Sequence, residues 1–240
     1  MGWYLAQEVG AVATLVGGTS RSGKVPPGTR WVADIATLAR DSDVVIDFTH
    51  ASTVRGHAAA MAAAGAKWVL GTTGYDSADA AAIQAAAQVV PVMAAPNFCT
   101  GLNVLLALAE KLGHLLPAAQ YDAEILEMHH RQKRDSPSGT ALALGHAVAA
   151  GRGVALADVM VSGRDGQSEP RRDGEIGFAA LRGGQIVGAH TLLFTAGDEQ
   201  ISLTHQAFDR RVFATGAVRA ALWLHAQPAG LYGMKDFLRI

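Results

Sequence analysis

The sequence has almost no cysteine, since Cys99 is the single one in 240 residues. One cysteine excludes a disulfide within the chain and is typical of a reducing cytoplasm. The chain also lacks a basic segment followed by an apolar one at its start, so no secretory leader is predicted. Its alanine-rich run, Ala58–Ala66, is too short to cross a bilayer. We therefore expect a cytoplasmic protein with no membrane partner.

The chain also lacks an excess of charge of either sign. Its formal net charge is -1 and 17% of its residues are charged, which argues against a nucleic-acid partner. Half of the residues are hydrophobic, so a buried core is expected and extended disorder is not. The length allows one large domain or two of moderate size.

Three short apolar runs recur in the first hundred residues, at Val44–Phe48, Trp68–Leu70 and Val89–Met93. They are continuous rather than alternating, as strands buried on both faces of a parallel sheet are. The alanine-rich stretches between them, His57–Ala64 and Ala78–Gln88, favour helix. This alternation of strand and helix predicts an α/β domain with a doubly wound (Rossmann-type) parallel sheet.

In such sheets, ligands bind beyond the carboxyl ends of the strands. The loops at these ends are expected at Phe48–His50, Gly71–Gly74 and Ala95–Phe98. Each loop also has a simpler interpretation, as a turn or as a helix breaker.

A second group of candidates lies in the run Glu127–Ala141. Ser136 is a suitable N-cap and Pro137 a suitable first helical residue, so the first turn is expected to hold Ser138, Gly139 and Thr140. Backbone N–H groups in a first turn lack intrahelical partners and favour an anion. Proton donors and positive charge lie just upstream, at His129, His130 and Lys133. The run predicts a carboxylate or phosphate site beside a general acid.

The same run also fits a plain helix cap that binds only water. No metal site is predicted there. Adjacent histidines on a strand point to opposite faces, and no second cluster of ligands completes a set.

The run Glu127–Ala141, with His129-His130 inside it, closely resembles the dihydrodipicolinate reductase (4-hydroxy-tetrahydrodipicolinate reductase) family. Ser136 stands where the family usually has alanine. The Gly-Thr-Thr-Gly and Ala-Pro-Asn-Phe loops resemble the family too, with Cys99 in place of a common serine. Two further segments resemble the family. One is Arg-Gly-Gly-x-Ile-Val-Gly-x-His, in which Ala189 replaces a common acid, and the other is the closing Gly-Leu-Tyr-Gly-Met-Lys-Asp-Phe-Leu.

The resemblance implies NAD(P)H-dependent reduction of 4-hydroxy-2,3,4,5-tetrahydrodipicolinate, a cyclic imine with two carboxylates, to tetrahydrodipicolinate in lysine (diaminopimelate) biosynthesis. Hydride addition builds negative charge that must be protonated, and a histidine suits that task. The implied catalytic residues are His129, as proton donor, and Lys133. The implied substrate-binding residues are His130, Ser138, Gly139 and Thr140. The implied cofactor-binding residues are Gly71, Thr72, Thr73, Ala95, Pro96, Asn97 and Phe98.

The preferred cofactor is predicted from the segment Val16–Lys24. NAD binders commonly place a carboxylate here for the ribose 2′-hydroxyl, whereas NADP binders place cations. The segment has no acid but contains Arg21 and Lys24, which could meet a 2′-phosphate or be plain surface charges. NADPH is therefore expected in preference to NADH.

The start of the chain departs from the family. A helix at Trp3–Val9 and a strand at Val12–Val16 are expected, but no strand and glycine-rich turn precede them. Met1-Gly2 resembles the last two residues of the family's Gly-x-x-Gly-Arg-Met-Gly turn. We expect a start codon assigned too late, with a genuine truncation as the alternative.

The second half predicts an α+β domain for substrate binding and oligomerisation, with a mixed or antiparallel sheet. A helix at Leu102–Leu115 and a strand at Tyr121–Met128 lead into three β segments, at Ile176–Leu181, Gln185–Thr195 and Gln200–Ala207. Hairpin turns are expected at 183–184 and 196–198. The last helix, Arg211–His225, is expected to return to the first domain.

The expected boundaries are 1–99 with 208–240 for the dinucleotide-binding domain, and 100–207 for the second domain. The resemblance further implies a homotetramer. Two other classes stay open: a non-catalytic binding protein that keeps the fold, and a different Rossmann oxidoreductase such as an amino-acid dehydrogenase. Nucleotide binding tests the first, and activity on aspartate tests the second.

Overall fold

The computed structural model describes residues 1–167 and 169–240. The chain forms two compact units, Met1–Thr100 with Arg210–Ile240, and Gly101–Asp209. Residue 168, in the polar stretch 162–173 of the sequence, lies outside the described residues. Within the described part of the chain, no helix has both the length and the apolar character needed to span a membrane.

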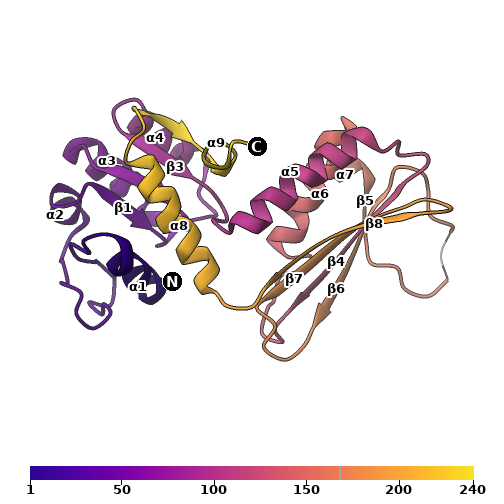
Figure 1. Cartoon of the computed structure of the whole chain (residues 1–240), viewed down its shortest axis with the longest axis horizontal. Helices are drawn as coiled ribbons and strands as arrows, with labels where there is room; N and C mark the ends of the chain where they lie inside the picture. Colours follow the sequence, from indigo (N-terminus) through magenta and orange to yellow (C-terminus); the bar gives the residue numbers. More distant parts are fainter. Residues whose placement is uncertain (168) are drawn as a thin grey trace. The chain divides into compact units, whose positions relative to one another are not determined.

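The first unit is built on a parallel four-stranded sheet with the order β1-β2-β3-β9 (Figure 1). Its strands are β1 (Val44–Asp47), β2 (Lys67–Leu70), β3 (Pro91–Ala94) and β9 (Gly230–Tyr232). The three predicted strands are confirmed with shifts of one or two residues at their ends. Strand β9 was not predicted because three residues carry no readable period.

Helices cover both faces of this sheet, as the doubly wound prediction requires. Trp68 and Val92 face a core shared with α2, α3 and α4, whereas Val69 and Met93 face α8 and α1. Successive strand residues point to opposite faces, so both layers are apolar. The helices are α1 (Gly2–Val12), α2 (Ile35–Arg40), α3 (Val54–Ala64), α4 (Ser77–Ala87), α8 (Arg211–Leu224) and α9 (Met234–Leu238), and a 3-10 turn, Ala51–Thr53, precedes α3.

The strand expected at Val12–Val16 is wrong. Val12 closes α1, and Leu15 and Val16 belong to no strand in the described chain. Just beyond this segment, Gly18 makes a parallel bridge with Trp31. A β-strand forms by backbone hydrogen bonds to a neighbouring strand. Among the described residues, no strand lies between this segment and the free edge of β1.

The second unit holds a five-stranded mixed sheet with the order β5-β6-β4-β7-β8. Its strands are β5 (Met160–Ser162), β6 (Ile176–Arg182), β4 (Asp122–His129), β7 (Gly188–Thr195) and β8 (Gln200–Ala207). The first three are parallel, and β7 and β8 are antiparallel to their neighbours. The hairpin at 196–198 is confirmed. The one at 183–184 is wrong, because β4 lies between β6 and β7.

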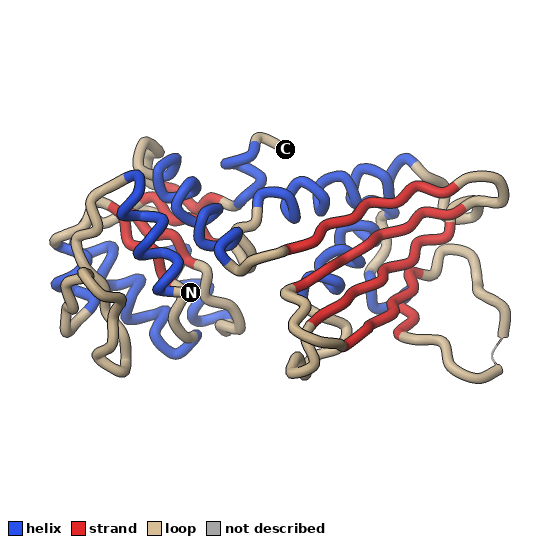
Figure 2. Tube along the Cα trace, turned by 60° about the horizontal axis from the view of Figure 1, so that its bottom comes forward, coloured by secondary structure: helices blue, strands red, loops and turns tan. Residues whose placement is uncertain are grey.

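Helices lie on one face of this second sheet (Figure 2). They are α5 (Thr100–Leu115), α6 (Gly139–Arg152) and α7 (Leu156–Val159). Along β4 every second residue is buried, and Ala123 and Ile125 join the core with Leu105 and Leu144 of the helices. This alternation decides which side chains of β4 reach the functional site.

Candidate active site

Two polar residues continue the buried face of β4 where the apolar residues end. Glu127 is 1% exposed and His129 is 8% exposed. Both follow Ala123 and Ile125 at intervals of two, so they share one side of the sheet. A buried carboxylate next to a buried imidazole needs full hydrogen bonding to be tolerated.

The Glu127 carboxylate has four hydrogen-bonding contacts. The Arg182 guanidinium donates to both of its oxygens, at 2.7 and 2.8 Å. The Ser138 backbone N–H donates at 3.0 Å, and His129 Nδ1 lies 2.6 Å from Oε2. Burial by itself raises the pKa of Glu127, but the hydrogen bonds from Arg182, His129 and Ser138 outweigh it and hold the pKa below its ordinary value. Glu127 is therefore a carboxylate at neutral pH.

Because an ionised carboxylate only accepts hydrogen bonds, Nδ1 of His129 carries the proton in this pair. The other ring nitrogen, Nε2, faces the backbone of Gly188. A Cβ at position 188 would lie 3.0 Å from Nε2, so glycine keeps this edge of the ring uncrowded. Burial lowers the pKa of His129, and the contact with Glu127 opposes that shift without cancelling it.

A second histidine, His190, lies next to His129. Its ring packs edge-on against the ring of His129, with centroids 5.1 Å apart. Burial, with a smaller effect from nearby His129, lowers the pKa of His190 to about 4, so the ring is neutral. Ser138 Oγ accepts from the Ala141 N–H and lies within hydrogen-bonding distance of His190 Nε2, at 3.1 Å.

The helix that follows begins two residues later than predicted. Ser138, not Ser136, is the N-cap of α6: its backbone is extended and its hydroxyl accepts the N–H of Ala141. Gly139 and Thr140 open the first turn, and their N–H groups precede the first intrahelical bond, from Leu142 N to Ser138 O. Gly139 and Thr140 therefore lie in the first turn, as predicted. Ser138 does not, because it is the N-cap that precedes this turn.

The remaining predicted residues of this run are less buried. Lys133 Nζ lies 2.8 Å from Asp135 Oδ2, and its side chain is 21% exposed. The Lys133 charge contributes to lowering the pKa of His129, and the contact with Lys133 holds the pKa of Asp135 below its usual range. His130 turns away from the core and contacts Gln132, with 3.1 Å between Nδ1 and Oε1.

In the first unit, the loops at the carboxyl ends of the strands are tied to one another. Thr49 N–H donates to Asp47 and to Thr72 Oγ1, both at 3.0 Å. The rings of Phe48 and Phe98 pack 5.6 Å apart. Gly71 lies so close to Phe48 that a Cβ would meet its ring at 2.4 Å. The predicted loops after β1, β2 and β3 therefore meet at one end of the sheet.

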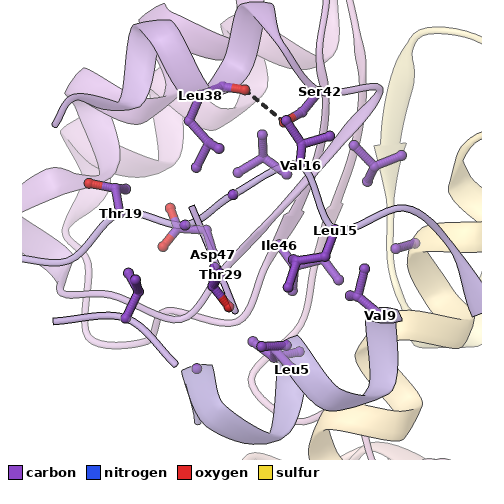
Figure 3. Close-up of a pocket in the computed structure, with 18 of the residues that line it drawn as sticks. Leu5, Val9, Leu15, Val16, Thr19, Thr29, Leu38, Ser42, Ile46 and Asp47 are labelled. Atoms are coloured by element: carbon purple, nitrogen blue, oxygen red, sulfur yellow. Dashed lines mark hydrogen bonds between the residues drawn. The ribbon is translucent and has the colours of Figure 1, made fainter. Parts of the chain in front are cut away.

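Asp47 anchors this end. It is 3% exposed, and His57 Nδ1 and Trp68 Nε1 lie 2.7 and 3.3 Å from Oδ2. Burial by itself raises the pKa of Asp47, but the hydrogen bonds from His57 and Thr49 outweigh this effect. The pKa therefore lies below its ordinary value, and Asp47 stays ionised. Asp47 also lines the cleft beside β1, as Figure 3 shows. An assembled loop cluster beyond the carboxyl ends of a doubly wound sheet fits a dinucleotide. No cluster of metal-binding side chains occurs among the residues described.

The two halves of the chain match two family models, described as dihydrodipicolinate reductase, N-terminus (residues 6–98) and C-terminus (residues 101–238). The chain belongs to the dihydrodipicolinate reductase family. The resemblance stated from the sequence is therefore confirmed.

Relatives within the family are similar over nearly their whole length. The 4-hydroxy-tetrahydrodipicolinate reductase of Granulibacter bethesdensis is 59% identical, covering 99% of this chain and 92% of that one. The enzyme of the same name from Acidiphilium cryptum is 60% identical, covering 99% and 93%. The solved structure of dipicolinate-bound dihydrodipicolinate reductase from Paenisporosarcina sp. TG-14 superposes with a TM-score of 0.77 at 23% identity, covering 97% and 95%, and supports the fold.

The sequence alone did not identify three residues of the polar group around His129 as functional. They are Glu127, Arg182 and His190. Glu127 could have been found from its i, i+2 spacing to His129 on a strand whose other residues alternate. Arg182 and His190 stood in a recognised motif, but their distance in sequence from His129 exceeds 50 residues. Only strand pairing shows that they reach it.

Proposed function

We propose that this family member reduces 4-hydroxy-2,3,4,5-tetrahydrodipicolinate to 2,3,4,5-tetrahydrodipicolinate with a nicotinamide cofactor, in lysine biosynthesis. The relatives of 59% and 60% identity carry that enzyme's name. The observation that carries the proposal is the Glu127–His129 pair, with Nδ1 held at 2.6 Å and Nε2 beside Gly188. Once the ring is doubly protonated, the ionised Glu127 stabilises the imidazolium and Nε2 is the nitrogen placed to donate its proton.

In this proposal, the substrate loses its 4-hydroxyl as water to give a conjugated dihydropyridine. His129 then protonates the ring atom that gains negative charge when hydride adds to it. Glu127 stabilises the imidazolium, in the manner of a carboxylate behind a general acid. The Gly139 and Thr140 N–H groups bind one substrate carboxylate at the positive end of α6. Lys133 assists catalysis by holding charge on the substrate, and His130 and Ser138 complete the binding group.

A nicotinamide cofactor supplies the hydride in this reaction. We assign its binding to the loop residues Gly71, Thr72, Thr73, Ala95, Pro96, Asn97 and Phe98. NADPH is the proposed partner in preference to NADH, through the exposed cations Arg21 and Lys24. The expected domain roles, a cytoplasmic location and a homotetramer stay predictions.

The proposal is tested by coupling the purified chain to the synthase that makes the substrate from pyruvate and aspartate semialdehyde. We expect NADPH oxidation that depends on the synthase. NADPH binding by calorimetry is measured in parallel, so that a failure to bind cofactor is distinguished from a failure of the chemistry. Cofactor binding without synthase-dependent oxidation would refute the proposal, and oxidoreductase activity on aspartate would favour an amino-acid dehydrogenase.

A further inference from the structure

The loop between β4 and α6, residues 130–137, carries Lys133 and contains no helix or strand. Within it, the Lys133 N–H donates to the His130 carbonyl at 3.1 Å and closes a turn. A loop with so little internal hydrogen bonding takes up one conformation only if groups outside it hold it in place. These groups come from the end of β6.

Two backbone hydrogen bonds join the segment after β6 to the start of this loop. The Gly183 N–H donates to the His129 carbonyl at 3.0 Å, and the Arg131 N–H donates to the Gly184 carbonyl at 3.2 Å. Gly184 has a φ of 47°, in the left-handed region that glycine adopts without strain. The start of the loop is thereby held next to the end of β6.

The second half of the loop is held by the side chain of Arg182, the last residue of β6. Its Nη2 donates to the backbone carbonyl of Asp135 at 2.7 Å. The carboxylate of Asp135 in turn lies 2.8 Å from Lys133 Nζ. One residue, Asp135, therefore connects the Arg182 guanidinium to the Lys133 ammonium.

The same guanidinium is connected to the imidazole of His129. It donates to both oxygens of Glu127, at 2.7 and 2.8 Å, and Glu127 lies 2.6 Å from His129 Nδ1. An arginine can bond in two directions at once because its donors form a rigid planar fork, whereas a lysine ammonium is a compact point charge. The guanidinium of Arg182 thus fixes the position of Asp135, and of the loop around it, relative to His129.

We propose that Arg182 is a positioning residue of the reaction, which holds the Lys133 ammonium at a set distance from the His129 imidazole. The inference rests on the proposed function, which gives roles to both of these groups. Both must act on one small substrate, and a displacement of about 1 Å near a reacting group can cost about 100-fold in rate. Loss of the fork releases Asp135 and Lys133 together.

Arg182→Lys tests this proposal, since it keeps the positive charge beside Glu127 and removes the fork. We expect kcat/KM in the coupled assay to fall at least about 10-fold. In a chain that already carries Lys133→Met, the same change should lower kcat/KM less than about twofold, because Arg182 acts through Lys133. Equal fold losses in both backgrounds would overturn the proposal. Arg40→Lys, an exposed arginine of the first unit, is the control and should retain full activity.

A second readout needs no activity, so it separates this inference from the proposed function. The contact with Lys133 holds the pKa of Asp135 below its usual range, and carbon-13 NMR follows the titration of that carboxyl. We expect Arg182→Lys to raise this pKa by at least about 0.5, toward its value in Lys133→Met, and Arg40→Lys to leave it unchanged. An unchanged pKa in Arg182→Lys would refute the inference. A raised pKa in a chain without reductase activity would support the positioning of Lys133 and count against the proposed function alone.

A third measurement uses the unmodified chain, so it does not depend on how the variants fold. A guanidinium held by Glu127 on one side and by the Asp135 carbonyl on the other should rotate slowly, and the Nη protons of Arg182 should then give separate NMR signals. A single averaged signal would show that the fork does not hold the loop, and the proposal would fail.

Discussion

Oε2 of Glu127 lies 2.6 Å from Nδ1 of His129, on the same buried face of β4, while Arg182 binds both carboxylate oxygens. The carboxylate is thus kept ionised in the interior by the arginine, and it orients the imidazole through the ring nitrogen that faces away from Gly188. Fixing one nitrogen defines the role of the other, so Nε2 is the proton-donating atom of the proposed reaction.

Glu127→Gln is expected to lower kcat about 10- to 100-fold, since an amide no longer stabilises the protonated ring. The Glu127 contact raises the pKa of His129 against burial, so its loss lowers that pKa further. A proton donor is active below its pKa, and the alkaline limb of the kcat/KM profile should therefore move to lower pH. Exposed Glu169→Gln is the matched control. If the alkaline limb of the kcat/KM profile does not move and only the melting temperature falls, the role of Glu127 is purely structural.

His129→Gln is expected to reduce kcat by roughly 10²- to 10⁴-fold with little change in KM, because general acid catalysis acts in the transition state. Steady-state kinetics in the coupled assay measure both constants. His146→Gln, on the exposed side of α6, is the control and should retain full activity. A raised KM at unchanged kcat would contradict the acid role and make His129 a binding residue.

Much of the architecture could be predicted from the sequence because its strongest signals are local. The continuous apolar runs gave β1, β2 and β3 to within one or two residues, and the run Glu127–Ala141 placed His129 at the end of a strand and Gly139 at a helix start. The N-cap was misplaced because Ser136 and Ser138 both have the right side chain. The hydrogen bond from the Ala141 N–H to Ser138 decides between them, and sequence does not show it.

The rest depends on pairing between distant segments. Arg182 reaches Glu127 because β6 runs parallel beside β4, with His129 opposite Arg182 in the register. His190 comes from β7, on the other side of β4, with Glu127 opposite it. The failed hairpin at 183–184 has the same origin, since short connections suggested neighbouring strands and the sheet order places β4 between them.

His190 is expected to make stability depend on pH. Its pKa is about 4 in the folded chain against 6.5 for the unfolded one, so the unfolded state binds the extra proton first. The stability that the neutral ring maintains above pH 6.5 is lost as pH falls toward 4, by about 2 kcal/mol between pH 7.5 and 5. Urea unfolding at both pH values should show this loss in the native chain and in His146→Gln, and a smaller loss in His190→Gln, where the lowered pKa of His129 still contributes. An equal loss in all three would exclude His190 as its source.

Asp47→Asn is expected to lower the free energy of unfolding by about 3 kcal/mol at pH 7, because a buried partner of His57 is lost. Asp41→Asn is the control, since its ion pair with Arg30 is exposed and worth less than about 1 kcal/mol. The folded pKa of Asp47 is lowered, so its stabilisation is present above pH 3.8 and disappears as pH falls through the folded value. Native chain and variant should therefore converge in acid. A constant difference down to pH 2 would show that the charge is not what stabilises the loops.

The last prediction concerns the choice of cofactor. Arg21 and Lys24 are both exposed on a turn closed by the hydrogen bond from Ser20 Oγ to Lys24 O, at 2.7 Å. Charge-assisted hydrogen bonds to a phosphate contribute about 1.5–3 kcal/mol, so Arg21→Ala with Lys24→Ala should weaken NADPH binding at least about 10-fold. NADH lacks the 2′-phosphate and should change less than about twofold. Calorimetric titration with each cofactor measures both affinities, with Arg40→Ala as a control that removes one exposed cation elsewhere. An equal loss for NADPH and NADH would mean that the two cations contact a part common to both cofactors, and the NADPH preference would have to come from elsewhere.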